Sequence, residues 1–265
     1  MQVQFPTGTA HATLDVDAVI VDLDGTMVDT IGDFAEAIRG MLADLPLSAK
    51  LMEHRHSIAL QCASLQNKEV ADMVGKGTEH LLRSVLQRLL GKLVATLPAE
   101  VPLPTVDTLY PQALHCYQHH YLGINGQHAA VYPGVHAGLQ MLKDAGLRLA
   151  CVTNKPLDFA LPLLRAKDLA SMFDKVYGGD SFARKKPDPL PLIQTCQALA
   201  STPARTLMLG DSSNDAQAAR AAGCPVVLVT YGYNHGRPIH EVDADGYVNA
   251  LTELSVPKTF VSLSG

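Results

Sequence analysis

The chain has 265 residues, of which 47% are hydrophobic and 18% are charged. This composition excludes an intrinsically disordered polymer and gives the chain enough apolar material to bury a sizeable core. With 21 basic and 26 acidic side chains the formal net charge is -5, so we do not expect nucleic acid or an anionic membrane to attract the molecule as a whole.

The first residues, MQVQFPTGTAHATLDVD, lack the basic segment and apolar stretch of a secretory signal. No apolar run approaches the roughly 18 residues of a membrane-spanning helix, so we expect a cytoplasmic protein without a membrane partner. The five cysteines form an odd set without a CxxC pair, which indicates reduced thiols rather than a disulfide framework. They are Cys62, Cys116, Cys151, Cys196 and Cys224.

The first predicted strand is the β-branched run AVIVDL at residues 18–23, which ends in Asp-Gly-Thr. A short apolar run bounded by a turn is typical of a buried strand in a parallel sheet. Helical spacing of apolar residues then predicts three helices, over 34–45, 78–93 and 106–122, with no comparable strand among them. Residues 47–68 and 253–265 fit neither pattern, and we assign them no role.

From Tyr132 onward, predicted strands and helices alternate. The strands are at 147–152, 175–177, 206–209 and 225–229, and the helices are at 135–145, after Pro156, after Pro187 and at 214–222. Such alternation is typical of βαβ units, so the sequence predicts a doubly wound, mainly parallel five-stranded α/β sheet. We expect residues 1–29 and 131–265 to form this Rossmann-like core and residues 30–130 to be a helical domain inserted into it.

Two carboxylates, Asp22 and Asp24, lie at the end of the first predicted strand. Residues i and i+2 of a strand point the same way, so both would emerge at the carboxyl edge of the sheet, where open α/β sheets bind ligands. Adjacent carboxylates repel each other unless one is protonated or a cation lies between them. The alternative is an ordinary strand-end turn, since Gly25 lets the backbone turn away.

A second pair, Asp211 and Asp215, follows the predicted strand 206–209. Alone, this pair is also explained as a helix start, with Ser212 or Ser213 as the cap and Asp215 in the first turn. Taken together, four carboxylates at two strand ends of one sheet are costly unless a hard cation is bound. A cluster of oxygen ligands without His or Cys suits Mg²⁺.

Two further strand ends carry polar groups. Thr153 and Asn154 follow the predicted strand 147–152, and Lys186 precedes a predicted helix in KKPDP. Each is individually typical of a helix cap or a solvated lysine. Together with the carboxylates, they supply the hydroxyl, amide and ammonium groups that a phosphoryl site needs.

The ordered motifs DLDGT, VTN, KKPDP and GDSSND resemble the four motifs of the haloacid-dehalogenase-like hydrolase superfamily, over about residues 18–232. The helical insertion after the first motif is similar to the C1-type cap of that family. The strings VGKGTEHLL, VYPGV, VTNKP, KKPDPLPL and GDSSNDAQAARAAGCP, followed by LVTYGYNHG, resemble the bacterial phosphoglycolate phosphatases within it.

This resemblance implies a Mg²⁺-dependent phosphomonoesterase that hydrolyses 2-phosphoglycolate through an aspartyl-phosphate. It implies that Asp22 is the nucleophile and that Asp24 is the general acid and base. Mg²⁺ would be held by Asp22, the backbone carbonyl of Asp24 and Asp211, with Asp215 as a further ligand or as an anchor behind them.

The resemblance also implies which residues bind the phosphate and select the substrate. The phosphate would be bound by Gly25, Thr26, Thr153, Asn154 and Lys186. Thr153 and Lys186 would also be catalytic residues, and Lys186 would balance charge on the nucleophile and on the phosphate. Residues Gly75, Lys76 and Gly77 match the cap loop that reaches over the site, and Lys76 would meet the substrate carboxylate. The alternative for Lys76 is a solvent-facing lysine ahead of a helix. The loop Tyr231-Gly232-Tyr233-Asn234 is expected to border the site without a catalytic role.

Other functions remain open within the same fold: a phosphosugar phosphatase or mutase, or a phosphonate hydrolase that forms a Schiff base on a cap lysine. A receiver-type signalling domain also carries an acceptor aspartate and Mg²⁺, but Asp24 and the long insertion argue against it. The expected partner is a small phosphorylated organic acid, with no nucleic acid, and the chain is expected to be a monomer or a homodimer.

Overall fold

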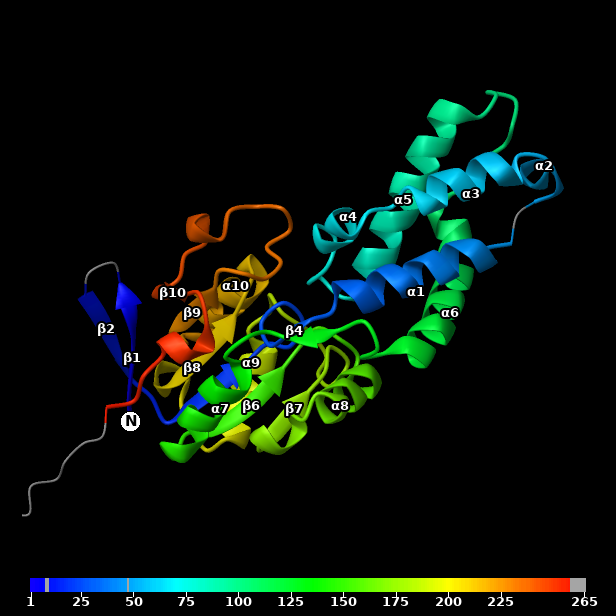
Figure 1. Cartoon of the computed structure of the whole chain (residues 1–265). Coiled ribbons are helices and arrows are strands. Elements are labelled where there is room, and N and C mark those ends of the chain that lie inside the picture. The colour runs from blue at the N-terminus through cyan, green and yellow to red at the C-terminus, as the bar shows by residue number, and fades with distance from the viewer. Residues whose placement is uncertain (8–9, 47, 258–265) are drawn as a thin grey trace, which may run out of the picture. The chain divides into compact units, whose positions relative to one another are not determined.

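The computed structural model describes residues 1–7, 10–46 and 48–257, and the chain divides into two compact units (Figure 1). Unit 1 comprises Met1–Val28 and Val131–Gly265, and unit 2 comprises Asp29–Ala130. The chain passes from one unit to the other through two short strands that pair with each other, β4 (Val28–Asp29) and β5 (Ala130–Val131).

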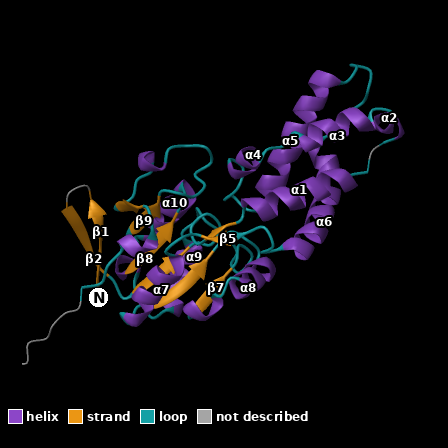
Figure 2. Cartoon of the chain, in the orientation of Figure 1, coloured by secondary structure: helices purple, strands orange, loops and turns teal. Residues whose placement is uncertain are grey.

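Unit 1 is built on a parallel sheet of six strands in the order β10-β9-β8-β3-β6-β7. Figure 2 distinguishes the strands, in orange, from the helices, in purple. In chain order these strands are β3 (Ala18–Val21), β6 (Arg148–Val152), β7 (Lys175–Tyr177), β8 (Thr206–Gly210), β9 (Val226–Val229) and β10 (Gly246–Val248). Every residue of β3, β8 and β9 is buried. Because successive residues of a strand face opposite sides, both faces of the sheet are covered here, and this explains the uninterrupted apolar runs.

The predicted doubly wound α/β fold is confirmed, and the sheet contains one strand more than the five predicted. The additional strand, β10, has only three residues and begins with glycine, a residue depleted in strands, so it does not stand out as a strand in the sequence. The helices of unit 1 also lie where the sequence predicts them. They are α7 (Val135–Asp144), α8 (Leu157–Ala166), α9 (Leu190–Ala198) and α10 (Ser213–Ala222).

An antiparallel hairpin, which no pattern in the sequence predicts, precedes the sheet. Its strands are β1 (Gln2–Thr7) and β2 (Ala10–Asp15). Gln4 of β1 pairs with Ser255, and a Cβ atom at Gly246 would lie 2.2 Å from the ring of Phe5. Part of the unassigned segment 253–265 thus holds the hairpin in place. Residues 258–265 of that segment lie outside the described part of the chain.

Unit 2 is helical. Its helices are α1 (Ile31–Asp44), α2 (Ala49–Met52), α3 (Arg55–Ala63), α4 (Asn67–Ala71), α5 (Thr78–Thr96) and α6 (Val106–Ile124). The predicted helices α1, α5 and α6 are confirmed. Of the unassigned residues 47–68, residue 47 lies outside the described part of the chain, and the others include α2, α3 and the start of α4. Stacked aromatic rings join α1 to α6: the ring centroids of Phe34 and Tyr121 lie 5.7 Å apart, and those of Tyr117 and Tyr121 lie 5.4 Å apart.

Among the described helices, none combines the length and the apolar character needed to cross a membrane. The five cysteines are free thiols.

Candidate active site

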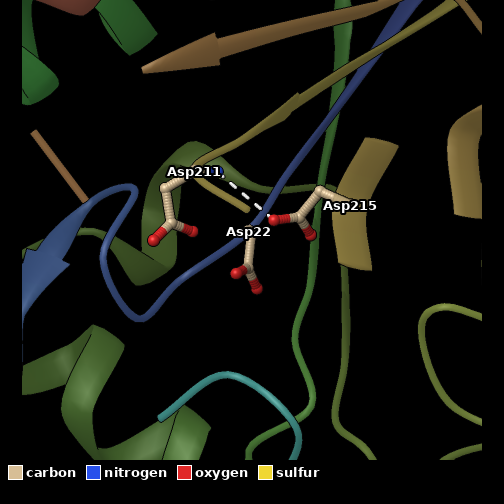
Figure 3. Close-up of side chains that lie close together, drawn as sticks. All are labelled: Asp22, Asp211 and Asp215. Atoms are coloured by element: carbon tan, nitrogen blue, oxygen red, sulfur yellow. Dashed lines mark hydrogen bonds between the residues drawn. The ribbon is translucent and has the colours of Figure 1, made fainter. Parts of the chain in front are cut away.

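The loops after neighbouring strands bring polar residues together at one edge of the sheet. Strand β3 lies between β6 and β8, so Asp22, Thr153 and Asp211 follow three adjacent strands. Asp215 belongs to the first turn of α10, and Figure 3 shows its carboxylate gathered with those of Asp22 and Asp211. The carboxyl edge of a parallel sheet is where this fold type binds ligands.

Asp22, Asp211 and Asp215 form a buried acidic cluster in which one oxygen from each residue lies within 4.8 Å of the other two. Burial raises the pKa of Asp22 to about 7, and Asp215 adds to the rise although Lys186 opposes it. Burial, Asp215 and Asp22 also raise the pKa of Asp211 well above its ordinary value. A divalent cation would relieve this repulsion, and oxygen ligands are those that Mg²⁺ prefers, so the residues fit Mg²⁺.

Lys186 supplies a positive charge inside the acidic cluster. Its side chain is only 2% exposed, and its Nζ lies 2.8 Å from Asp22 Oδ1 and 2.7 Å from Asp215 Oδ1. Burial by itself lowers the pKa of Lys186, but Asp215 and Asp22 outweigh this effect and raise it, so the ammonium stays charged. Asn154 Nδ2 donates to the carbonyl of Lys186 at 2.8 Å and ties the loops after β6 and β7 together.

Asp215 both caps helix α10 and belongs to the cluster. Its Oδ2 accepts from the backbone N–H of Asp211 and of Ser212, each at 3.2 Å, and from Ser212 Oγ at 2.8 Å. Ser212 and Asp215 form a capping box. Both interpretations of this motif, a helix cap and a member of an acidic cluster, therefore apply to Asp215. The positive end of the helix favours its carboxylate.

Asp211 is fixed on both sides of its carboxylate. Its Oδ1 accepts from the hydroxyl of Thr26 at 3.0 Å, and its Oδ2 accepts from the backbone N–H of Tyr233 at 2.6 Å. Two glycines make room for it: a Cβ at Gly25 would lie 2.1 Å from Asp211 Oδ2, and one at Gly232 would lie 2.2 Å from Asp211 Cβ. Thr26 is fully buried, so its hydroxyl serves to orient Asp211.

The loop after β9 supports this edge of the site. Tyr231 OH donates to the carbonyl of Thr26 at 2.8 Å, and its ring centroid lies 4.3 Å from that of Tyr132. Asn234 Oδ1 accepts from the backbone N–H of Ser213 at the start of α10. In the sequence, the string LVTYGYNHG indicated that this loop borders the site. The contacts of its side chains become visible only in the structure.

Asp24 forms an ion pair with a residue that is absent from the predicted site. Lys155 Nζ donates to Asp24 Oδ1 at 2.8 Å, and the side chains are 3% and 10% exposed. Thr153 Oγ1 accepts from the backbone N–H of Lys155 at 3.1 Å, which places the predicted Thr153 and this lysine in one turn. Lys155 is the lysine of the motif VTNKP. Nothing in the sequence indicated that it belongs to the site, because a lysine after a strand is usually solvated.

The structure brings together the core residues of the predicted site: the carboxylates, Gly25, Thr26, Thr153, Asn154 and Lys186. The predicted residues Gly75, Lys76 and Gly77 belong to unit 2, ahead of α5, and their part in the site stays a prediction. Gly75 and Gly77 have φ angles of 103° and 89°, which favour glycine, and Lys76 is exposed.

Comparison with known proteins gives concordant results. A family model described as haloacid dehalogenase-like hydrolase matches residues 16–223. A phosphoglycolate phosphatase of Thiobacillus denitrificans is 39% identical over 246 residues, covering 93% of this chain and 97% of that protein. One of Nitrosospira multiformis is 41% identical over 243 residues, covering 92% and 96%. The crystal structure of a predicted phosphoglycolate phosphatase from Haemophilus somnus superimposes with a TM-score of 0.75 at 29% identity, covering 90% of this chain and 96% of that chain.

Proposed function

Because the chain belongs to the haloacid dehalogenase-like hydrolases, we propose that it is a Mg²⁺-dependent phosphatase that converts 2-phosphoglycolate to glycolate and phosphate. Its similarity to phosphoglycolate phosphatases along nearly its whole length makes it a phosphoric monoester hydrolase. The observation that carries the chemical proposal is the cluster of Asp22, Asp211 and Asp215, with the buried ammonium of Lys186 paired to Asp22 and Asp215.

In the proposed reaction, a carboxylate oxygen of Asp22 attacks phosphorus in line and the bond from phosphorus to the glycolate oxygen breaks. The product on the protein is an aspartyl-phosphate. Asp24 gives a proton to the departing alkoxide and then removes one from the water that hydrolyses the aspartyl-phosphate. Proton transfer of this kind contributes about 10²–10⁴-fold to a rate.

Other residues of the core position the phosphoryl group and balance its charge. Lys186 faces both Asp22 and the site of the phosphate, and its ammonium stabilises negative charge there. We assign the phosphoryl oxygens to Thr153, to Asn154 and to the backbone at Gly25. The hydroxyl of Thr26, which donates to Asp211, acts on that carboxylate.

Asp22, Asp211 and the backbone carbonyl of Asp24 would hold Mg²⁺. Asp215 serves as the anchor behind them, since its two oxygens already accept from Lys186, Asp211 N and Ser212. When bound, the cation would offset the repulsion between an anionic nucleophile and an anionic phosphate. We further propose that unit 2 acts as a cap and that Gly75, Lys76 and Gly77 contribute to substrate selection.

Phosphate release from a panel of small phosphomonoesters tests this function. We expect phosphoglycolate to give the highest kcat/KM with Mg²⁺, no release with EDTA, and none from Asp22→Asn. Asp17→Asn is a matched control, because Asp17 lies just before β3 and pairs with Arg205 away from the cluster. A higher kcat/KM for sugar phosphates than for phosphoglycolate would overturn the proposed substrate. A folded protein that releases no phosphate from any of these esters would overturn the assignment as a phosphatase.

A further inference from the structure

Unit 1 buries a second lysine beside its candidate active site. The whole of Lys155 is only 5% exposed, and its ammonium pairs with Asp24. Burying an ammonium is costly unless it is paired, and the partner of Lys155 is the proposed general acid and base. Lys186 already balances the charges of Asp22 and Asp215, and the charge of Lys155 is therefore directed at a different part of the site.

The backbone of Lys155 is held in place by the loop after β7. Its carbonyl accepts from the N–H of Gly179 at 2.8 Å. A Cβ at Gly178 would lie 2.8 Å from that carbonyl, and one at Gly179 would lie 2.3 Å from the carbonyl of Asn154. Two glycines thus permit the close approach that fixes the backbone of Lys155. The ammonium is therefore carried by a buried, anchored residue and not by a mobile side chain on the surface.

Its partner places Lys155 on the side of the leaving group. In the proposed reaction Asp24 is hydrogen-bonded to the oxygen of the leaving alkoxide, at about 2.7 Å. Lys155 Nζ lies 2.8 Å from Asp24 Oδ1. The carboxylate carbon of glycolate is two bonds from the same leaving oxygen, a separation of about 2.5 Å, comparable to that from N to C within one residue. These separations allow a carboxylate there to come within ion-pair reach of the ammonium.

We propose that Lys155 binds the carboxylate of the substrate, so that the core itself selects phosphorylated short organic acids. This inference rests on the proposed function, and it moves recognition of the carboxylate from the exposed Lys76 of unit 2 to a buried residue of unit 1. Lys155 is then a substrate-binding and specificity-determining residue.

Two substrates that differ only in charge test the proposal: 2-phosphoglycolate and the phosphate ester of glycolamide, its neutral isostere. We expect the wild-type protein to prefer the acid. In Lys155→Met, kcat/KM for the acid falls about 10- to 100-fold more than kcat/KM for the amide, the size of one lost charge-assisted hydrogen bond. Both substrates depend on Asp24, so a loss caused by misplacing Asp24 lowers both rates equally.

Lys155→Gln keeps a donor for Asp24 without the charge, and it should lose the same preference. It also keeps the test available if the methionine variant does not fold, which circular dichroism would show. Lys175→Met is the matched control, because Lys175 is an exposed lysine at the start of β7, and it should leave the preference unchanged.

Equal losses on both substrates would overturn the proposal and leave Lys155 as a positioning residue for Asp24. A preference that changes in Lys76→Met but not in Lys155→Met would overturn it as well. These results are distinct from a failure of the proposed function, which the wild-type protein reports by itself through its ranking of phosphoglycolate against sugar phosphates.

Discussion

A hydroxyl, a backbone N–H and two glycines surround the carboxylate of Asp211. We predict that Gly232→Ala weakens Mg²⁺ binding about 10- to 100-fold, the usual effect of disturbing the groups that orient a metal ligand. The new Cβ would lie 2.2 Å from Asp211 Cβ and must displace either the carboxylate or the loop. Isothermal titration calorimetry with Mg²⁺ measures the change.

Gly91→Ala is the control for this substitution, since a Cβ at Gly91 meets nothing within 4 Å. It lies inside α5, where alanine is the better helix former, and should leave Mg²⁺ binding unchanged. If Gly232→Ala binds Mg²⁺ as the wild-type protein does, the loop after β9 does not orient Asp211.

The ionisation of Asp22 predicts how Mg²⁺ binding depends on pH. Burial holds the pKa of Asp22 at about 7 in the metal-free protein. Below that pH the carboxyl group carries a proton that the cation must displace, and above it the proton is already gone. We therefore expect the apparent Mg²⁺ affinity to rise as pH increases through about 7. An affinity that stays constant between pH 6 and pH 8 would contradict this prediction.

At the scale of single elements, Asp33 fixes the start of α1. Its side chain is fully buried, and its oxygens accept from the backbone N–H of Gly126 at 2.6 Å and of His128 at 2.7 Å, in the loop after α6. We predict that Asp33→Ala lowers the free energy of unfolding of unit 2 by about 1–3 kcal/mol, because two backbone donors lose their acceptor. Urea unfolding followed by circular dichroism measures this loss.

Asp107→Ala is the matched control, because Asp107 also lies in a first helical turn but is exposed and pairs with Arg83. Its replacement should change the free energy of unfolding little. An Asp33→Ala protein as stable as the wild type would show that these hydrogen bonds do not hold the loop.

Strands that are buried on both faces could be predicted from the sequence, because their own residues are mostly apolar. Elements held by contacts with distant parts of the chain show no such local pattern and could not be predicted. The strands β3, β8 and β9 carry their own pattern, since each of their residues is buried. Helix α3 buries only Ile58, so its apolar stripe is too weak to recognise. The hairpin strand β1 depends on its contact with Ser255, which lies at the other end of the described chain.

The same distinction applies to the site. Asp22, Asp211 and Lys186 follow strands or precede a helix, and the rule that ligands bind at the carboxyl edge of a parallel sheet predicts that they meet. The pairing of Lys155 with Asp24 joins positions 131 residues apart. No local pattern distinguishes Lys155 from a solvated lysine, and only the folded chain shows that it is buried.

At the scale of the whole molecule, Mg²⁺ binding should increase the free energy of unfolding. A ligand that binds only the folded state stabilises it by about 2.7 kcal/mol at a concentration of 100 times its Kd. We therefore expect Mg²⁺ to raise the Tm of unit 1, EDTA to reverse the shift, and Asp211→Asn to reduce it. Differential scanning calorimetry measures this, and a Tm that saturating Mg²⁺ leaves unchanged would contradict the fit of the acidic cluster to this cation.

Asp22 attacks phosphorus in the proposed reaction, so phosphate must be covalently bound to this residue during turnover. Rapid acid quenching with ³²P-labelled phosphoglycolate and Mg²⁺, followed by peptide mapping, tests this step most directly. We predict a label that is stable in acid, released by hydroxylamine, located on Asp22 and absent from Asp22→Asn. A label on another residue, or the same label in Asp22→Asn, would contradict the assignment of Asp22 as the nucleophile.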